Sequence, residues 1–188
     1  MNLLIAGLSS LILCSVFYLI WWRAGFYPGV QVSRVTGKVG ALLYITAALG
    51  LAGVILTSVG LGRIPVDKDL LPGTVVLIGA VAVYLILLFG TRFLFHRQVT
   101  TELALIVGWA ALMVMAAGRV YAGNLIGRSA FTALLLITAC AVIMSLYFYL
   151  AYYNVEPMRG FVYGMIPLIT VGLSMLVFLV MLLAGRPA

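Results

Sequence analysis

The stretch GALLYITAALGLAGVILTSVGLG, residues 40–62, carries no charged side chain over its whole length. An α-helix rises about 1.5 Å per residue and the hydrocarbon layer of a bilayer is about 30 Å thick, so roughly 20 apolar residues cross it. The stretch therefore predicts a transmembrane helix. Its many small residues are typical of membrane helices that pack closely against their neighbours, because small side chains let two backbones approach.

Five further apolar stretches flank this one, and short polar connections separate them. Only 8% of the 188 residues are charged, whereas a soluble domain has about 25%, so the chain could not cover a water-facing surface. We predict an all-α, polytopic transmembrane bundle of about six spans, which occupies residues 1–188 as a single domain without a soluble domain. The first span lacks a basic amino-terminal region and a cleavage site, so we expect it to be retained. The predicted spans are residues 3–22, 40–62, 74–95, 102–118, 130–153 and 161–184.

The net charge of +7 comes from basic residues scattered through the connections, not from a basic run. Basic residues at span ends meet phospholipid headgroups and bias orientation, so we expect membrane lipid, and not nucleic acid, as a partner. Arg23, Arg34 and Lys38 lie in the first connection, whereas no basic residue precedes the first span. This difference favours an external N-terminus. We expect an integral protein of a prokaryotic plasma membrane.

Two segments of the chain resemble each other. Residues 41–48, ALLYITAA, and residues 133–140, ALLLITAC, are identical at six of eight positions. Their offset of 92 residues is close to half the chain and aligns the second span with the fifth. A 3+3 duplication would produce this match and would place the two halves in opposite orientations, as in many transporters. Chance similarity between membrane helices, which use few residue types, is the alternative explanation.

No ionisable residue lies in the middle of a predicted span. Such a residue costs on the order of 3 kcal/mol to insert and by default indicates function, so its absence argues against a proton-coupled or sodium-coupled pump. The one histidine, His96, lies in a connection, and Cys14 and Cys140 lie in separate spans without a CxxC motif. We therefore expect no metal and no cofactor. The sequence has neither an HExxH nor a GxSxG motif, so it gives little support to an enzyme.

The best single candidate site is EPMR, residues 156–159, between the last two spans. Glu156 and Arg159 lie there at the water interface, next to Tyr149, Tyr152 and Tyr153 at the end of the fifth span. A carboxylate, a guanidinium and several phenols could together bind a lipid headgroup or an amphipathic solute. The alternative interpretation is an aromatic belt beside a turn with a local ion pair.

The second span is predicted to be the central helix of the bundle. One of its ridges consists mainly of small residues that recur every four positions, Gly40, Tyr44, Ala48 and Ala52, and the small pair Gly53 and Thr57 lies beside it. A hydrated cavity between the second and fifth spans would be lined by Thr46 and Thr138.

Three functions remain open. The first is a transporter or channel for a neutral or amphipathic solute. The second is a non-catalytic subunit or assembly factor, which binds other membrane subunits or further copies of itself. The third is a lipid-modifying enzyme that uses the interfacial residues Glu156, Arg159 and His96. A hydrated cavity lined by Thr46 and Thr138 would favour transport, whereas a dry bundle with a flat face of small residues would favour a subunit.

Overall fold

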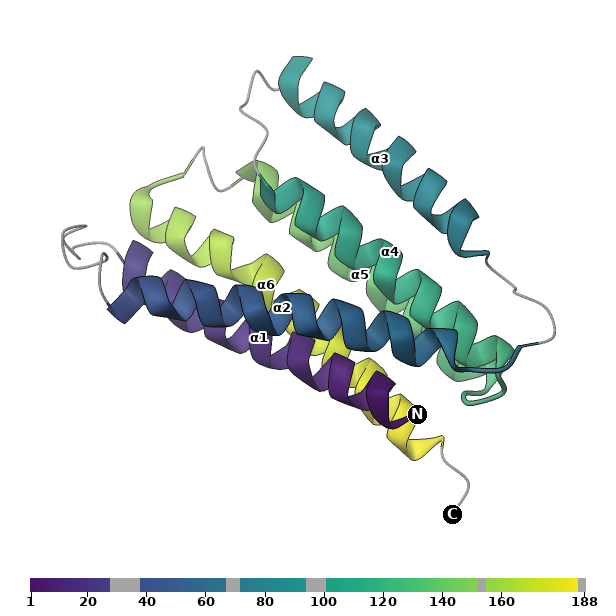
Figure 1. Cartoon of the computed structure of the whole chain (residues 1–188). Helices are drawn as coiled ribbons and strands as arrows, with labels where there is room; N and C mark the ends of the chain where they lie inside the picture. The colour runs from purple at the N-terminus through teal and green to yellow at the C-terminus, as the bar shows by residue number, and fades with distance from the viewer. Residues whose placement is uncertain (28–37, 67–71, 94–100, 152–154, 186–188) are drawn as a thin grey trace.

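The computed structural model describes residues 1–27, 38–66, 72–93, 101–151 and 155–185. Within these residues the chain forms six α-helices and no strands, which confirms the predicted all-α helical bundle. Each helix is long and apolar enough to cross a membrane. The helices run alongside one another (Figure 1): α1 (Asn2–Phe26), α2 (Lys38–Gly62), α3 (Gly73–Phe93), α4 (Thr101–Ala122), α5 (Arg128–Ala151) and α6 (Pro157–Ala184).

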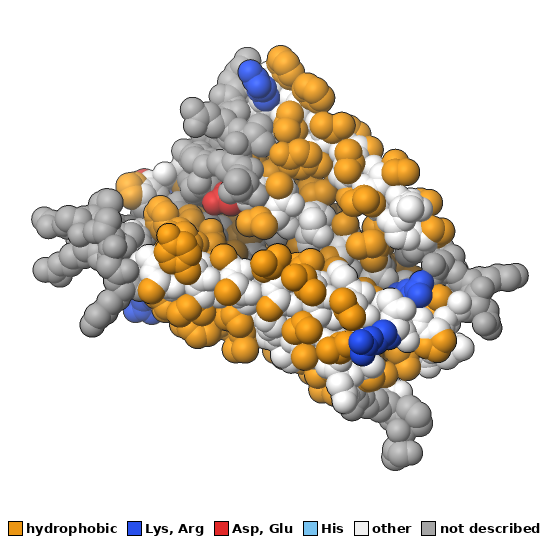
Figure 2. Space-filling model, in the orientation of Figure 1, with side chains coloured by type: hydrophobic (Ala, Val, Ile, Leu, Met, Phe, Trp, Pro, Cys, Tyr) orange, Lys and Arg blue, Asp and Glu red, His pale blue; other side chains and the backbone are white. Residues whose placement is uncertain are grey.

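The outer surface of the bundle suits hydrocarbon. Large apolar side chains are exposed on all six helices. Figure 2 shows such side chains along the flanks of the molecule, with the visible lysine and arginine side chains near the ends. This distribution places the basic groups at headgroup level and the apolar flanks in the membrane interior, so the chain is an integral membrane protein.

Several helices extend beyond the predicted spans. α1 continues past residue 22, the predicted end of the first span, so that Arg23 lies in its last turn and not in the first connection. α4 continues past Gly118, the predicted end of the fourth span, so that Arg119 lies in its last turn. α6 begins at Pro157 instead of Phe161, with Glu156 at its N-cap position. Proline is well tolerated at the first helical position, because the missing N–H would have no partner within the helix. The segment EPMR is therefore the start of a helix and not a free turn.

α1 and α2 pack against each other along a line of small residues, which we call the glycine seam. A Cβ atom added to Gly60 would lie 2.6 Å from the backbone nitrogen of Leu4, and one added to Gly7 would collide with Thr57. Such distances leave no room for a side chain, so the two backbones are in direct contact. The seam consists of Gly7 in α1 and Gly50, Gly53, Thr57 and Gly60 in α2.

Hydrogen bonds to α2 carbonyls reinforce the glycine seam. The Ser10 hydroxyl donates to the carbonyl oxygen of Leu49 at 2.9 Å, and the Cys14 thiol donates to that of Thr46 at 3.2 Å. Both donors lie on α1, one helical turn apart. They fix the register of the two helices as well as their separation.

The predicted ridge of α2 does not face the bundle. Tyr44 is 78% exposed, Ala48 and Ala52 are exposed, and no atom lies within 4 Å of a Cβ added to Gly40. The prediction that α2 is the central helix is also wrong, because α2 packs along α1 and meets α4 near its carboxyl end. The glycine-rich face is the buried one, since glycine permits a closer approach than alanine or tyrosine.

The remaining helices continue from α1 in a fixed order of neighbours. α6 packs on α1 and on α5, α5 packs on α4, and α3 packs on α4 at the outside of the bundle (Figure 1). Under the predicted duplication, the pair α1–α2 corresponds to α4–α5. However, α6 packs against α5, whereas α3 has no comparable contact with α2. The duplication stays a prediction.

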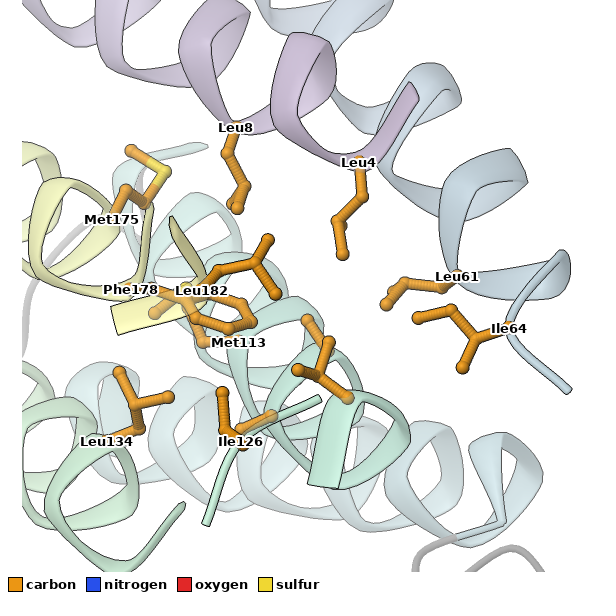
Figure 3. Close-up of a cluster of buried hydrophobic side chains, with 13 residues drawn as sticks. Leu4, Leu8, Leu61, Ile64, Met113, Ile126, Leu134, Met175, Phe178 and Leu182 are labelled. Atoms are coloured by element: carbon orange, nitrogen blue, oxygen red, sulfur yellow. The ribbon is translucent and has the colours of Figure 1, made fainter. Parts of the chain in front are cut away.

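An apolar core fills one end of the bundle. Its buried side chains come from α1, α2, α4, α5 and α6 and point toward one another in Figure 3. They include Leu4, Leu8, Leu61, Met113, Leu134, Met175, Phe178 and Leu182. The Arg119 guanidinium lies beside this core and donates to the carbonyl oxygens of Leu61 and Ile64 at 3.2 and 3.3 Å. It thereby ties α4 to the last turn of α2 and to the segment that follows, where the Leu61 carbonyl also accepts the Ile64 N–H at 3.1 Å.

A tight turn joins α4 to α5 at the same end. Asn124 adopts a left-handed conformation with φ of 56°, and the Leu125 N–H donates to the Val120 carbonyl at 3.0 Å. A left-handed residue followed by such a backbone hydrogen bond is a common way to end an α-helix. Leu125 and Ile126 pack on the apolar core.

The glycine seam predicts a large difference between two glycines near the end of α2. Gly60→Ala should destabilise the protein by about 1–3 kcal/mol, because its new methyl group overlaps the Leu4 backbone. Gly62→Ala is the matched control, since no atom lies within 4 Å of its added Cβ. Thermal unfolding of the purified protein in detergent measures both variants. Equal stability of the two would contradict the seam.

Candidate functional site

Glu156 and Arg159 lie at the amino-terminal end of α6, and both side chains are exposed. Glu156 makes no side-chain cap to the helix. Both residues belong to the described part of the chain, and no ion pair between them is present there. The predicted local ion pair is therefore not formed, and both charges face outward. Tyr152 and Tyr153, which complete the predicted site, lie outside the described residues.

Tyr149 does not join Glu156 and Arg159. Its side chain is only 4% exposed and packs with Leu103 and Ile106 of α4 in a second apolar cluster. Tyr84 and Leu87 of α3 pack against the same cluster. Tyr149 thus holds α3, α4 and α5 together, which the sequence could not indicate because a tyrosine near a span end usually belongs to the aromatic belt.

Thr46 and Thr138 are buried, but the structure does not bring them together. Each hydroxyl donates to a carbonyl of its own helix at 2.8 Å, Thr46 to Leu42 and Thr138 to Leu134. α2 packs mainly on α1, whereas α5 packs on α4 and α6. Such bonds to the preceding turn satisfy a hydroxyl without a partner helix. A role for these threonines in a solute path stays a prediction.

An aromatic platform at the carboxyl end of α1 was not predicted as a site. The Trp22 indole N–H donates to the Phe161 carbonyl of α6 at 3.2 Å, and its ring stacks on Phe26 at 4.5 Å. Tyr27 contacts the Phe161 ring edge-on at 5.5 Å. Gly164 makes room for the indole, because a Cβ at this position would overlap the Trp22 ring. The adjacent tryptophans Trp21 and Trp22 indicate the membrane–water interface, but the sequence could not indicate that Trp22 bonds to Phe161, which is remote from it in the chain.

Glu102 is a second residue whose environment the sequence did not indicate. It lies in the first turn of α4, as predicted, but its side chain is half-buried. The charge of its carboxylate acts on the Tyr18 phenol of α1.

The described residues contain no group of three metal-binding side chains. Cys14 donates its thiol proton to α2, and Cys140 is exposed on α5. His96 lies outside the described residues. The polar chemistry in the described part of the chain is thus concentrated at the helix ends, around the aromatic platform and Glu102.

The aromatic platform predicts that Trp22 stabilises the packing of α1 on α6. Trp22→Phe keeps a ring but removes the hydrogen bond to Phe161, so it should destabilise the protein by about 1 kcal/mol. Trp21→Phe is the control, because Trp21 neighbours it in sequence but is less buried. Thermal unfolding in detergent compares the two. Unchanged stability of Trp22→Phe would show that the hydrogen bond contributes nothing.

Comparison with known proteins identifies no relative of this chain. No family model, no curated protein and no solved structure matches the chain. Its function therefore has to be inferred from its own residues and their arrangement.

Proposed function

We propose that the chain is a non-catalytic membrane subunit that binds other membrane helices through the exposed ridge of α2. The observation that carries the proposal is the apolar core, to which five helices contribute buried side chains. This core fills the bundle at one end, where a continuous path for a solute would have to pass. The buried hydroxyls of Thr46 and Thr138 are satisfied by their own helices, which also favours a dry interior.

The outward ridge of α2 supports the same proposal. Gly40, Ala48 and Ala52 leave the helix backbone accessible along this ridge, with the exposed ring of Tyr44 between them. Helices associate in lipid through close backbone packing, since no hydrophobic force separates them from acyl chains. A partner helix would gain such packing at this ridge. The partner is either a second copy of the chain or a different membrane subunit.

Blocking the ridge tests the proposal. We expect wild-type protein, purified from its native membrane in nanodiscs, to retain a stoichiometric partner whose mass is measured by native mass spectrometry. Ala48→Trp should reduce the retained partner about tenfold, because the indole prevents backbone contact. Cys140→Trp is the matched control on α5, at the position that the predicted duplication aligns with Ala48.

Two results would overturn the subunit proposal. Wild-type protein could be recovered as a single chain at every protein-to-nanodisc ratio. Alternatively, Cys140→Trp could release the partner as completely as Ala48→Trp, which would show that the ridge has no special part in binding.

Transport of an amphipathic solute is the second candidate function. The observation that favours it is the half-buried carboxylate of Glu102, whose charge acts on the Tyr18 phenol, at the end of the bundle opposite the apolar core. A carboxylate beside an aromatic ring suits a cation with apolar substituents. The core would then close one side of the protein while the other side receives the solute.

Uptake of tetraphenylphosphonium into liposomes tests transport. If the chain transports such cations, Glu102→Gln should lower the initial rate about tenfold, because the carboxylate no longer attracts the cation. Glu156→Gln and Arg159→Gln test the predicted interfacial site in the same assay, and unchanged uptake in both would exclude it. Wild-type uptake no faster than that of protein-free liposomes would exclude transport of this solute class.

A further inference from the structure

Pro167 divides α6 into two segments that differ in burial. We call residues 157–166 the amino segment and residues 168–184 the carboxyl segment. The one buried residue of the amino segment, Gly160, has no side chain, whereas the carboxyl segment buries Ser174, Met175, Phe178 and Leu182. A segment with few buried side chains opens at a low free-energy cost. The amino segment is therefore held less firmly than the rest of the helix.

The turn around Pro167 is suited to bending. Proline has no N–H, so the Tyr163 carbonyl lacks the backbone donor that it would have in a regular helix. One turn later, the Thr170 hydroxyl lies 3.1 Å from the Ile166 carbonyl oxygen and 2.9 Å from that of Pro167. Hydrogen bonds from a hydroxyl to the preceding turn also bend helices. Two independent features thus place the point of bending at the boundary between the segments.

α5 holds α6 directly after this turn. Ser145 of α5 is fully buried, and its hydroxyl oxygen lies 3.3 Å from that of Thr170. Further along the carboxyl segment, Met175 and Phe178 pack in the apolar core. The carboxyl segment is therefore fixed both at its start and along its length. Bending at Pro167 would move the amino segment and leave the carboxyl segment in place.

The aromatic platform holds the amino segment. The Phe161 carbonyl accepts the Trp22 indole N–H at 3.2 Å, and the Phe161 ring meets the Tyr27 ring edge-on. Tyr163 meets the ring of Phe148 in α5, with ring centroids 5.0 Å apart. These contacts lie at the end of the bundle opposite the apolar core (Figure 1). The hydrogen bond from Trp22 is the directional one among them, so its loss would release the segment from α1.

We propose that the amino segment of α6 pivots about Pro167 and that the hydrogen bond from Trp22 to Phe161 is its latch. When the latch breaks, the segment bends away from α1 and opens the end of the bundle opposite the apolar core. The carboxyl segment keeps its place on α5 during this movement. The device does not involve the exposed ridge of α2, so it stands whether or not the chain is a subunit.

Distances between spin labels, measured by double electron–electron resonance in nanodiscs, test the pivot. One label is attached through Leu13→Cys on α1, and the other through Val162→Cys in the amino segment or Val180→Cys in the carboxyl segment. All three positions are exposed. The 13–162 pair should show a second, longer distance. Trp22→Phe should raise its population about fivefold, the effect of losing one hydrogen bond.

The labelled protein needs a background without its native thiols. Cys14→Ser and Cys140→Ala remove both, and the serine keeps a donor for the Thr46 carbonyl. The 13–180 pair is the matched control in this background. Its distance should be single and should not change with Trp22→Phe, because the carboxyl segment stays on α5.

Pro167→Ala tests the position of the pivot. It restores a backbone donor for the Tyr163 carbonyl, so it should suppress the longer 13–162 distance even when combined with Trp22→Phe. Three results would overturn the proposal. The 13–162 distance could stay unchanged in Trp22→Phe, the longer distance could persist in the double variant, or the 13–180 pair could shift as far as the 13–162 pair, which would show that α6 moves as one rigid helix.

Discussion

Van der Waals contact between the backbones of α1 and α2 is the interaction on which the rest of the bundle depends. Hydrophobic burial cannot drive this contact, because the surrounding acyl chains are as apolar as the helices themselves. Glycines on both sides remove the side chains that would separate the helices, and Ser10 and Cys14 donate to carbonyls across the seam. With α2 in place, α1 presents its next face to α6; α6 packs on α5, and α5 packs on α4. α3 is the outermost helix, because it contacts the bundle mainly through α4.

The hydrocarbon of the membrane also explains why most buried hydroxyls form no hydrogen bond to another helix. A hydroxyl in hydrocarbon must find an acceptor, and the carbonyl of the preceding turn is always within reach. Thr46, Thr138 and Ser174 each take this local solution. Ser145 and Thr170 are the described pair that meets across α5 and α6, at 3.3 Å. The Thr57 hydroxyl, buried in the glycine seam, is the exception among the described residues, since it has no hydrogen-bond partner. The other buried hydroxyls mark helix packing and give no evidence of a hydrated path. The groups with chemistry to offer lie at the helix ends, where water and headgroups compete for them.

The sequence predicts the helices well because the thickness of the bilayer sets their length. It predicts their packing poorly, since polarity does not distinguish the inside of a membrane bundle from its outside. α2 has small residues on two faces, and its sequence does not indicate which of them packs on a neighbouring helix. The ridge with Ala48 was predicted to be buried, but the face with Gly53 packs on α1. The residues of the candidate site were predicted poorly for the same reason. Tyr149 packs against α4, and Trp22 donates a hydrogen bond to Phe161 of α6, which is distant in sequence. Exposure of Glu156 and Arg159 was predictable from their position at the end of a span, although both belong to the start of α6 and not to a free turn.

The faces of α2 and α5 connect the predicted duplication to the proposed docking ridge. Positions related by the offset of 92 residues share their environment: Thr46 and Thr138 are both buried, and so are Gly53 and Ser145. Outward positions agree as well, because Tyr44 and Leu136, Ala48 and Cys140, and Ala52 and Met144 are all exposed. The side chains at these outward positions differ, however. α5 presents Leu136 and Met144, whose flexible side chains project into the membrane, whereas α2 presents Ala48 and Ala52 on one side of the exposed Tyr44 ring and leaves its backbone accessible at these two alanines. A helix that approaches from the membrane would meet fewer steric obstacles on α2 than on α5, so the two halves, whatever their origin, differ where a partner would bind.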